Sequence, residues 1–388
     1  MADTIIIGGG CHGASLAYHL ALRGVRDVAL VERRGLAGGN TGKSGAIVRQ
    51  HYSTPATARL AHRALRVFEN FRDIVGGDID PGFRRTGMLV LAGPQDAAVL
   101  RANVEMQQGL DIGTELIDPA SVREIEPRLA LDSGAAICWE PDAGYADPVA
   151  TTAAYAYAAR RLGATLHLGV TVTAIRVENG RVRGVETDQG FMPAERVAVV
   201  ANAWGPALLA PLGVDVPIVP SRHPIVQLRQ PADFGAPHPV VIDLTRKIYL
   251  RPDGATTTWV GSVDDADAAQ PAPVDGYHEG VTQDEVATFS RSAATLLPAL
   301  GPAIHKGGWA GLYDVTPDWQ PAVGAASGLG GLYLALGFSG HGFKLCPVFG
   351  DLLAQLITTG ESPDLHPYRP TRFAEGDLTQ GLYAGVVG

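Results

Sequence analysis

The stretch that decides the fold is Thr4-Ile5-Ile6-Ile7-Gly8-Gly9-Gly10-Cys11-His12-Gly13. Its apolar, β-branched beginning is typical of a buried parallel strand. Apolar residues at helical spacing follow over 14–23, and a second apolar strand over 28–31 ends in Glu32. A strand, a helix and a strand within about 30 residues predict a right-handed βαβ unit.

The three glycines of Gly8-x-Gly10-x-x-Gly13 each have a mechanical role in such a unit. The first permits a tight turn, the second lets a pyrophosphate approach the backbone, and the third lets helix and strand pack closely. The helix N-terminus offers N–H donors to phosphates, and Glu32 is placed to accept hydrogen bonds from a ribose. The pattern predicts a dinucleotide site and disfavours NADP, because a carboxylate repels its 2′-phosphate. The alternative is a glycine-rich turn without a ligand.

Two later glycine-rich segments extend this prediction. Gly39-Asn40-Thr41-Gly42-Lys43-Ser44-Gly45 follows the second strand, where a loop lies beside the phosphates and redox ring of a dinucleotide; a solvated loop is the alternative. Gly337-Phe338-Ser339-Gly340-His341-Gly342-Phe343-Lys344 stands between a strand and a helix. The N–H groups of a helix start stabilise negative charge, which a reduced flavin carries and a reduced nicotinamide lacks. The second segment therefore favours a flavin over NAD.

Composition and charge exclude several classes of protein. The chain has 388 residues and a net charge of −9, whereas a nucleic-acid partner needs a basic face. It has no run of about 18 apolar residues to span a membrane, and it begins without a signal-peptide pattern. Its three cysteines form no disulfide framework, and no metal-ligand spacing is present. We therefore expect a cytoplasmic protein without a metal site.

The pattern changes along the chain in a way that predicts two interleaved domains. Asn179-Gly180 predicts the turn of a hairpin, and alternating strands over 224–228, 247–251 and 257–261 predict an antiparallel sheet. We expect a first domain built from 1–85, 140–215 and 305–388, and a second built from 86–139 and 216–304.

Five motifs occur in the order found in a known family: Gly8-x-Gly10-x-x-Gly13 with Glu32-Arg33, Gly39-Asn40-Thr41-Gly42-Lys43, Ile47-Val48-Arg49, Gly311 to Asp318, and Gly340-His341-Gly342-Phe343-Lys344. The chain resembles the D-amino-acid oxidase superfamily, in the branch of sarcosine oxidase β-subunits, dimethylglycine dehydrogenases and glycine oxidase. The resemblance implies an α/β fold, in which a Rossmann-like FAD-binding domain of glutathione-reductase type is interleaved with an α+β substrate domain on a mainly antiparallel sheet. It also implies oxidation of an amino-acid C–N bond by hydride transfer to flavin N5, followed by imine hydrolysis.

The resemblance assigns roles to individual residues. Arg49 and Lys344 match a basic pair that grips the substrate carboxylate, Val172 matches a position that meets adenine, and Ala203 and Trp204 match a segment along the FAD. The other expected cofactor contacts are Gly8, Gly10, Cys11, His12, Gly13, Glu32, Arg33, Gly39, Asn40, Thr41, Lys43, Ser44, Gly311, Gly337, Gly340, His341, Gly342, Phe343 and Lys344 itself. Near the substrate we also expect Tyr249 and His51, with a packed aromatic and a structural histidine as the alternatives.

Two departures from the family pattern matter. Gly311 stands where monomeric sarcosine oxidases carry the cysteine that bonds to flavin, so we expect non-covalent FAD. The stretch 248–263 has no lysine to activate oxygen, and Lys247 aligns poorly, so oxidase and dehydrogenase activity both stay open.

The expected substrate is a small amino-acid or amine carboxylate, foremost an N-methylated or secondary amino acid such as sarcosine. The alternatives are a D-amino-acid or glycine oxidoreductase and a β-like flavoprotein subunit that needs a partner. Electrons would pass to oxygen or to an acceptor protein. The expected assembly is a homo- or hetero-oligomer.

Overall fold

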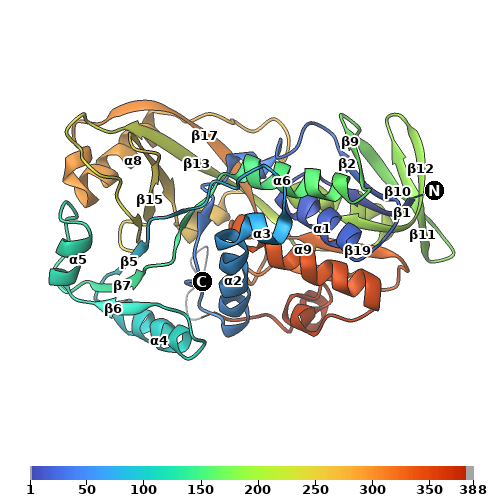
Figure 1. Cartoon of the computed structure of the whole chain (residues 1–388), viewed down its shortest axis with the longest axis horizontal. Helices are drawn as coiled ribbons and strands as arrows, with labels where there is room; N and C mark the ends of the chain where they lie inside the picture. The colour runs from blue at the N-terminus through green and yellow to red at the C-terminus, as the bar shows by residue number, and fades with distance from the viewer. Residues whose placement is uncertain (1, 382–388) are drawn as a thin grey trace.

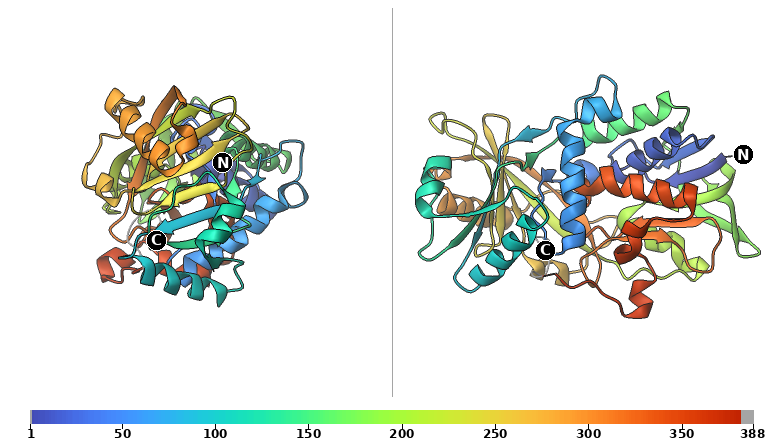
Figure 2. Two further views of the ribbon diagram at one scale, coloured as in Figure 1. Left: turned by 90° about the vertical axis from the view of Figure 1, so that its left-hand side faces the viewer. Right: turned by 60° about the horizontal axis from the view of Figure 1, so that its bottom comes forward.

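The computed structural model describes residues 2–381, in which two eight-stranded sheets lie toward opposite ends of an elongated molecule (Figure 1). Helix α2 (Pro55–Glu69) stands between the two sheets (Figure 2). Within these residues, no helix is both long and apolar enough to cross a membrane.

The first sheet has a parallel core that begins with the predicted βαβ unit. Its parallel strands are, in spatial order, β19 (Leu332–Leu336), β12 (Gly190–Val199), β1 (Ala2–Ile7), β2 (Val28–Glu32) and β9 (Thr165–Leu168). Strand β18 (Ala322–Ala325) adds an antiparallel edge, and β10 (Val172–Glu178) and β11 (Arg181–Thr187) form a hairpin on the N-terminal half of β12. Positive φ angles of 51° at Asn179 and 71° at Gly180 confirm the predicted turn.

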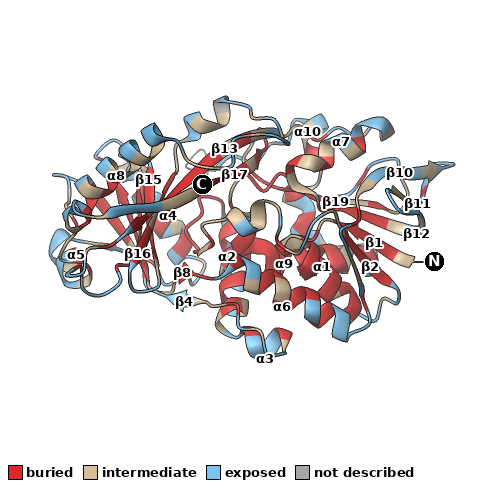
Figure 3. Cartoon of the chain, turned by 90° about the horizontal axis from the view of Figure 1, so that it is seen from above, coloured by how far each residue is buried: buried red, intermediate tan, exposed pale blue. Residues whose placement is uncertain are grey.

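Helices cover one face of this sheet with an apolar layer (Figure 3). They are α1 (Cys11–Leu22), α6 (Pro148–Arg161) and α9 (Gly342–Thr359), flanked by α2 and α3 (Phe71–Val75). Helix α1 begins three residues before the predicted start, because Gly10 already serves as its N-cap. Short helices α7 (Gly205–Leu209) and α10 (Arg372–Glu375) complete this end of the molecule.

The second sheet is antiparallel except for one parallel pair, β14 with β5. Its spatial order is β17 (Ile304–Val315), β13 (Val219–Arg229), β16 (Thr257–Ser262), β15 (Ile248–Asp253), β14 (Val240–Asp243), β5 (Met88–Ala92), β7 (Ala136–Glu140) and β6 (Glu115–Ile117). Helix α8 (Gln283–Leu296) packs on one face, α4 (Ala97–Gln108) contacts β6 and β7 at the far edge, and α5 (Pro119–Ile125) lies beside them. The expectation of a mainly antiparallel sheet is confirmed.

One expected domain boundary needs correction. Strand β17 pairs with β13 along its length, from Val315 opposite Val219 to Ile304 opposite Arg229, so residues 305–315 belong to the second sheet. The chain re-enters the first sheet only at β18. We call the first sheet with its helices the first unit, and the second sheet with its helices the second unit. A small sheet of β3 (Ile47–Val48), β8 (Gly144–Tyr145) and β4 (Arg84–Arg85) lies where the chain passes between them.

Candidate active site

Two adjoining cavities run from the glycine loop of the first sheet to the face of the second. We call them the glycine-loop cavity and the inter-sheet cavity. Both are lined by Cys11, His12, Asn40, Thr41, Asn202 and Phe338. They therefore form one continuous space that an elongated molecule is able to fill.

The glycine loop has a shape that only glycines permit. Gly8 has a φ of 118°, and a Cβ there would lie 2.4 Å from the carbonyl oxygen of Val200. A Cβ on Gly13 would lie 1.9 Å from the carbonyl oxygen of Gly8, so Gly13 supports the loop from behind. Gly10 caps α1 without a side chain and lines the glycine-loop cavity. This cradle and the helix start behind it fit a diphosphate.

Glu32 lies at the end of β2 and lines the same cavity. Its carboxylate accepts hydrogen bonds from the N–H groups of Gly9 and Arg34, each at 2.7 Å. These bonds hold the acid beside the glycine loop, where the sequence predicts a ribose. Val172, which is the first residue of β10, and Trp204 also line the glycine-loop cavity.

Residues 271–281, which we call the crossing segment, reach from the second unit over the rim of the cavities. Asp275 accepts hydrogen bonds from Arg33 and from the indole nitrogen of Trp204, both at 3.0 Å. Arg33 also lies 4.6 Å from the centre of the Trp204 ring. Lys43 donates to the hydroxyl of Tyr277 at 2.6 Å and pairs with an acid of the same segment. The crossing segment of the second unit thus binds the side chains of Arg33, Lys43 and Trp204 in the first unit.

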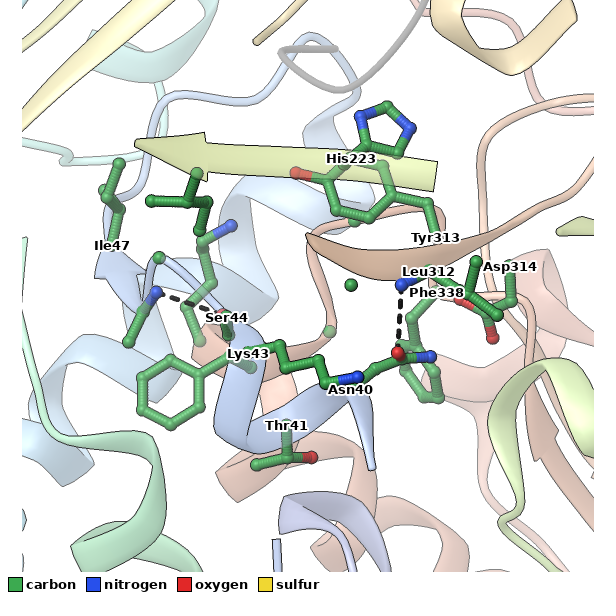
Figure 4. A pocket seen from close by; sticks show the side chains of 18 of the residues that line it. Asn40, Thr41, Lys43, Ser44, Ile47, His223, Leu312, Tyr313, Asp314 and Phe338 are labelled. Atoms are coloured by element: carbon green, nitrogen blue, oxygen red, sulfur yellow. Dashed lines mark hydrogen bonds between the residues drawn. The ribbon is translucent and has the colours of Figure 1, made fainter. Parts of the chain in front are cut away.

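Asn40 connects the glycine-rich segment 39–45 to strand β17. Its Oδ1 accepts a hydrogen bond from the N–H of Leu312 at 2.9 Å (Figure 4). Its Nδ2 donates a hydrogen bond to Asn202 at 2.7 Å. Gly311, next to Leu312, lines the inter-sheet cavity, and a Cβ there would lie 3.2 Å from the Cβ of Lys43. Gly39 lines the glycine-loop cavity, whereas Ser44 lines the inter-sheet cavity.

Arg49 and Lys344 come from distant parts of the chain to one wall of the inter-sheet cavity. Both are buried, with exposed fractions of 4% and 7%. The Arg49 guanidinium lies 4.3 Å from the centre of the Tyr52 ring, and the Lys344 ammonium position lies 5.8 Å from it. Burial and the neighbouring charge of Arg49 hold the pKa of Lys344 well below its usual range. The sequence prediction that these two side chains meet agrees with their positions.

Glu140, at the end of β7, is a buried acid next to the site that the sequence does not reveal. It is fully buried, and its two oxygens accept hydrogen bonds from the N–H groups of Gln50 at 2.6 Å and His51 at 3.0 Å. Burial raises its pKa to about 7, although the Gln50 amide and the charge of Arg49 oppose that shift. The acid fixes the irregular segment that follows Arg49. Its place depends on long-range strand pairing and on no motif.

The second sheet forms the opposite wall of the inter-sheet cavity. Tyr249 projects from β15 into it, and glycines leave room for this ring, since a Cβ on Gly45 would lie 2.7 Å from its hydroxyl. Burial raises the pKa of Tyr249. His223 of β13 stacks on Tyr313 of β17, with ring centres 3.6 Å apart (Figure 4). Sequence reasoning missed His223 because nothing in its local pattern marks it.

Five of the predicted site residues line neither cavity: Gly13, His51, Ala203, Gly337 and His341. The ring of His51 packs among side chains of α4, with Asn103 at 2.9 Å and Gln107 at 3.3 Å. Burial lowers its pKa to about 3, so this histidine is neutral near neutral pH. The structure thus places His51 behind the wall and outside both cavities, while a role in the reaction stays a prediction.

Some of the other residues of the segment 337–344 line the inter-sheet cavity, and others hold the segment in place. Gly340, Gly342, Phe343 and Lys344 line the inter-sheet cavity. The N–H of Gly337 donates to the buried carboxylate of Asp314 at 2.7 Å, and burial raises the pKa of that acid to about 6. Asp314 therefore holds the backbone at the start of the segment 337–344. The local sequence of β17 does not indicate this role.

Lys247 lies away from the site. It occupies the turn between β14 and β15, more than half exposed, where it pairs with Asp264 at 2.6 Å. Lys43 and Lys344 are the lysines that line the inter-sheet cavity within residues 2–381. In the same part of the chain, no three His, Cys, Asp or Glu side chains are grouped to hold a metal ion.

The fold, in which a glycine-loop βαβ unit joins a mainly antiparallel sheet, defines a dinucleotide-dependent oxidoreductase. The chain belongs to the FAD dependent oxidoreductase family, which it matches over residues 3–356. FAD is therefore the expected cofactor, and the resemblance found in the motifs is confirmed.

Known relatives include oxidases and dehydrogenases. Human mitochondrial dimethylglycine dehydrogenase is 29% identical, over 98% of this chain and 45% of its own length. Sarcosine oxidase subunit beta of Rhodobacter capsulatus is 26% identical, over 99% of this chain and 92% of its own. The crystal structure of L-proline dehydrogenase from P. horikoshii is 31% identical with a TM-score of 0.89, and covers 97% of this chain and 99% of that one. The chain spans less than half the length of the dimethylglycine dehydrogenases it matches.

Proposed function

We propose that this chain oxidises the C–N bond of a small N-methylated or otherwise secondary amino acid, with non-covalently held FAD as the hydride acceptor. One observation carries the proposal: two buried basic side chains, Arg49 and Lys344, share a wall of the cavity that adjoins the glycine loop. Buried cations favour a carboxylate ligand, and Arg offers a bidentate fork for it. When bound, FAD supplies a flavin ring whose N5 takes up the hydride.

The residues proposed to hold FAD follow the two cavities. Gly8, Gly10 and the start of α1 would bind the diphosphate, Glu32 the ribose, and Val172 the region of the adenine. Segments 39–45 and 337–344 would lie against the ring, because they line the space shared with the inter-sheet cavity. The absence of a thiol at Gly311 supports a non-covalent attachment.

At the substrate end, the proposed roles follow from charge and polarity. Arg49 and Lys344 would bind the carboxylate, while Ile47, Ile242 and Tyr249 supply apolar surface for a small alkyl group. An amine gives up hydride only when its nitrogen is uncharged, and a cationic wall lowers the pKa of a bound ammonium group. Water would then hydrolyse the substrate imine.

A cyclic secondary amino acid is the second candidate substrate. The relative named L-proline dehydrogenase is similar over nearly the whole of both chains, and a ring nitrogen meets the same chemical requirement. The name sarcosine oxidase subunit beta supports a further proposal, that a partner subunit assembles with this chain. Oxygen and an acceptor protein both remain candidate oxidants, since Lys247 lies away from the cavities.

The experiment that tests this function is anaerobic bleaching of the purified flavoprotein. Sarcosine, dimethylglycine, L-proline, glycine and D-alanine are each mixed with the enzyme, and absorbance of the oxidised flavin is followed. We expect fast bleaching by a secondary or tertiary amino acid and slow bleaching by glycine. Preferential bleaching by glycine or D-alanine would contradict the proposed substrate class, and a colourless protein that binds no added FAD would contradict the cofactor.

The Arg49→Ala variant tests the carboxylate assignment. A charge-assisted hydrogen bond contributes about 1.5–3 kcal/mol, so we expect the substrate concentration for half-maximal bleaching to rise by roughly 10- to 150-fold. The flavin should stay bound, because Arg49 lines only the inter-sheet cavity. Arg66→Ala, on an exposed side chain of α2, is the matched control. Unchanged half-saturation in Arg49→Ala would remove the assignment.

A further inference from the structure

Lys344 stands in surroundings that disfavour a charged amine. It is the third residue of α9, an 18-residue helix, so the positive end of the helix dipole lies at its backbone. Its side chain is buried, and the guanidinium of Arg49 shares the same wall. Within residues 2–381, no carboxylate lies within 4.0 Å of its Nζ. Three features therefore act against the ammonium form.

The groups that face Lys344 do little to restore the charge. Tyr52, His341 and His12 are buried, and burial keeps each of them neutral near neutral pH. Glu140 is the one facing acid in the described chain whose charge favours the ammonium form. Both of its oxygens already accept backbone N–H groups of the segment after Arg49. Its charge is thus shared among several donors.

We propose that Lys344 is a neutral amine in the substrate-free enzyme and accepts the proton of the substrate's ammonium group. This inference rests on the proposed function, because it requires that an amino acid bind beside Arg49. A secondary amino acid arrives as a zwitterion at neutral pH. One N–H bond of its ammonium group breaks, the proton joins the lone pair of Lys344 Nζ, and no electrons are gained or lost.

The transfer satisfies two requirements of the site at once. The charged Lys344 then faces the substrate carboxylate, which replaces the missing acid partner. The substrate nitrogen regains a lone pair and is able to release hydride from an adjacent carbon. After the product leaves, Lys344 returns its proton to solvent and the neutral form is restored. Lys344 is thereby assigned a proton-accepting role in addition to carboxylate binding.

Binding of an amine-free carboxylate to the FAD-loaded enzyme tests this inference. Methoxyacetate resembles sarcosine with an ether oxygen in place of the amine, so it brings a carboxylate and no proton. We expect about one proton to be taken up from the buffer at pH 7.5, measured as the dependence of the calorimetric binding enthalpy on the buffer's ionisation enthalpy. A lysine that is already charged predicts binding without proton uptake, which would overturn the proposal.

The Lys344→Arg variant tests whether Lys344 is the group that takes up the proton. A guanidinium stays charged throughout this pH range, so the variant should bind methoxyacetate without proton uptake, and uptake that persists would overturn the proposal. Lys306→Arg, at an exposed position of β17, is the matched control. If the variant does not fold, the wild-type enzyme still gives a second measurement. Its affinity for methoxyacetate should fall about tenfold per pH unit above the pKa of free Lys344, and a flat profile would overturn the proposal.

Failure of the proposed function has a different signature. If no small carboxylate binds, or if Arg49→Ala binds methoxyacetate as tightly as the wild-type enzyme, then the anion site itself is refuted. Binding that depends on Arg49 but takes up no proton leaves that site standing and refutes only the role given to Lys344.

Discussion

At the scale of single residues, a buried acid that lines neither cavity, Glu140, lies behind the wall of the site. Glu140 accepts two backbone N–H groups directly after Arg49, and its charge acts on a wall that carries the basic side chains of Arg49 and Lys344. Because the bonds go to the backbone, the acid sets the path of the chain as well as the local potential. We propose it as a positioning residue.

The pH dependence of stability should report this acid. The pKa of Glu140 is raised from an ordinary 4.5 to about 7 in the folded protein, so its contribution to stability is present below pH 4.5 and is lost as pH rises through 7. We expect the free energy of unfolding of the wild type to lose on the order of 3 kcal/mol across this window through Glu140. Glu140→Gln should remove that loss in urea titrations at several pH values.

The control for this titration is an acid on the surface. Glu178→Gln changes an exposed side chain of β10, so its stability profile should run parallel to that of the wild type. If the Glu140→Gln profile also runs parallel to the wild type, then Glu140 does not titrate in this window and its assigned burial is wrong.

At the scale of elements, close packing of α1 against α9 joins the two helix starts that border the cavities. A Cβ on Gly350 of α9 would lie 2.2 Å from the hydroxyl oxygen of Ser15 and 2.9 Å from the backbone nitrogen of Leu16. The helices therefore touch almost backbone to backbone. This contact fixes how the glycine loop and the segment 337–344 face each other.

Gly350→Ala should separate these helices. The added methyl group has no space, and overpacking typically costs about 1–3 kcal/mol, so we expect a lower melting temperature and weaker FAD retention. Gly35→Ala is the control, because a Cβ there meets nothing within 4 Å and its backbone is not left-handed. Equal melting temperatures for the two variants would show that α9 shifts without penalty.

At the scale of the whole molecule, the crossing segment of the second unit contacts side chains that line both cavities, so we expect cofactor retention to depend on both units. Asp275 holds Arg33 and Trp204, which both line the glycine-loop cavity. Tyr277 holds Lys43 at the inter-sheet cavity in the same way. The second unit thus closes the rim of a site whose base belongs to the first.

Asp275→Ala should release FAD faster. The Asp275 side chain is 62% exposed, so its ion pair contributes no more than about 1 kcal/mol, and we expect release to accelerate by up to about fivefold. Recovery of flavin fluorescence after dilution measures this rate, and the difference should shrink at high salt. Asp80→Ala changes an exposed acid of similar kind and should leave the rate unchanged. An identical rate in Asp275→Ala would show that the segment does not retain FAD.

The sequence predicts the parts of this molecule that are encoded locally. The glycine loop, the Asn179-Gly180 turn and the presence of helix α1 follow from short patterns, although α1 begins three residues before its predicted start; Arg49 and Lys344 lie inside family motifs. The position of Glu140, by contrast, depends on the pairing of β7 with β5, which the residues near Glu140 in the sequence do not indicate. The contacts of the His51 ring with Asn103 and Gln107 of α4 likewise join distant parts of the chain, so the local sequence does not indicate them.

The origin of the anion-binding wall has a consequence for biogenesis. Arg49 follows β3 of the small sheet between the two units and Lys344 lies in the first turn of α9, whereas the acid that accepts the backbone N–H groups after Arg49 ends β7 of the second sheet. Because Glu140 ends a strand of the second sheet and holds the backbone that follows Arg49, the receptor for the substrate's acid group is complete only when both sheets have folded and docked.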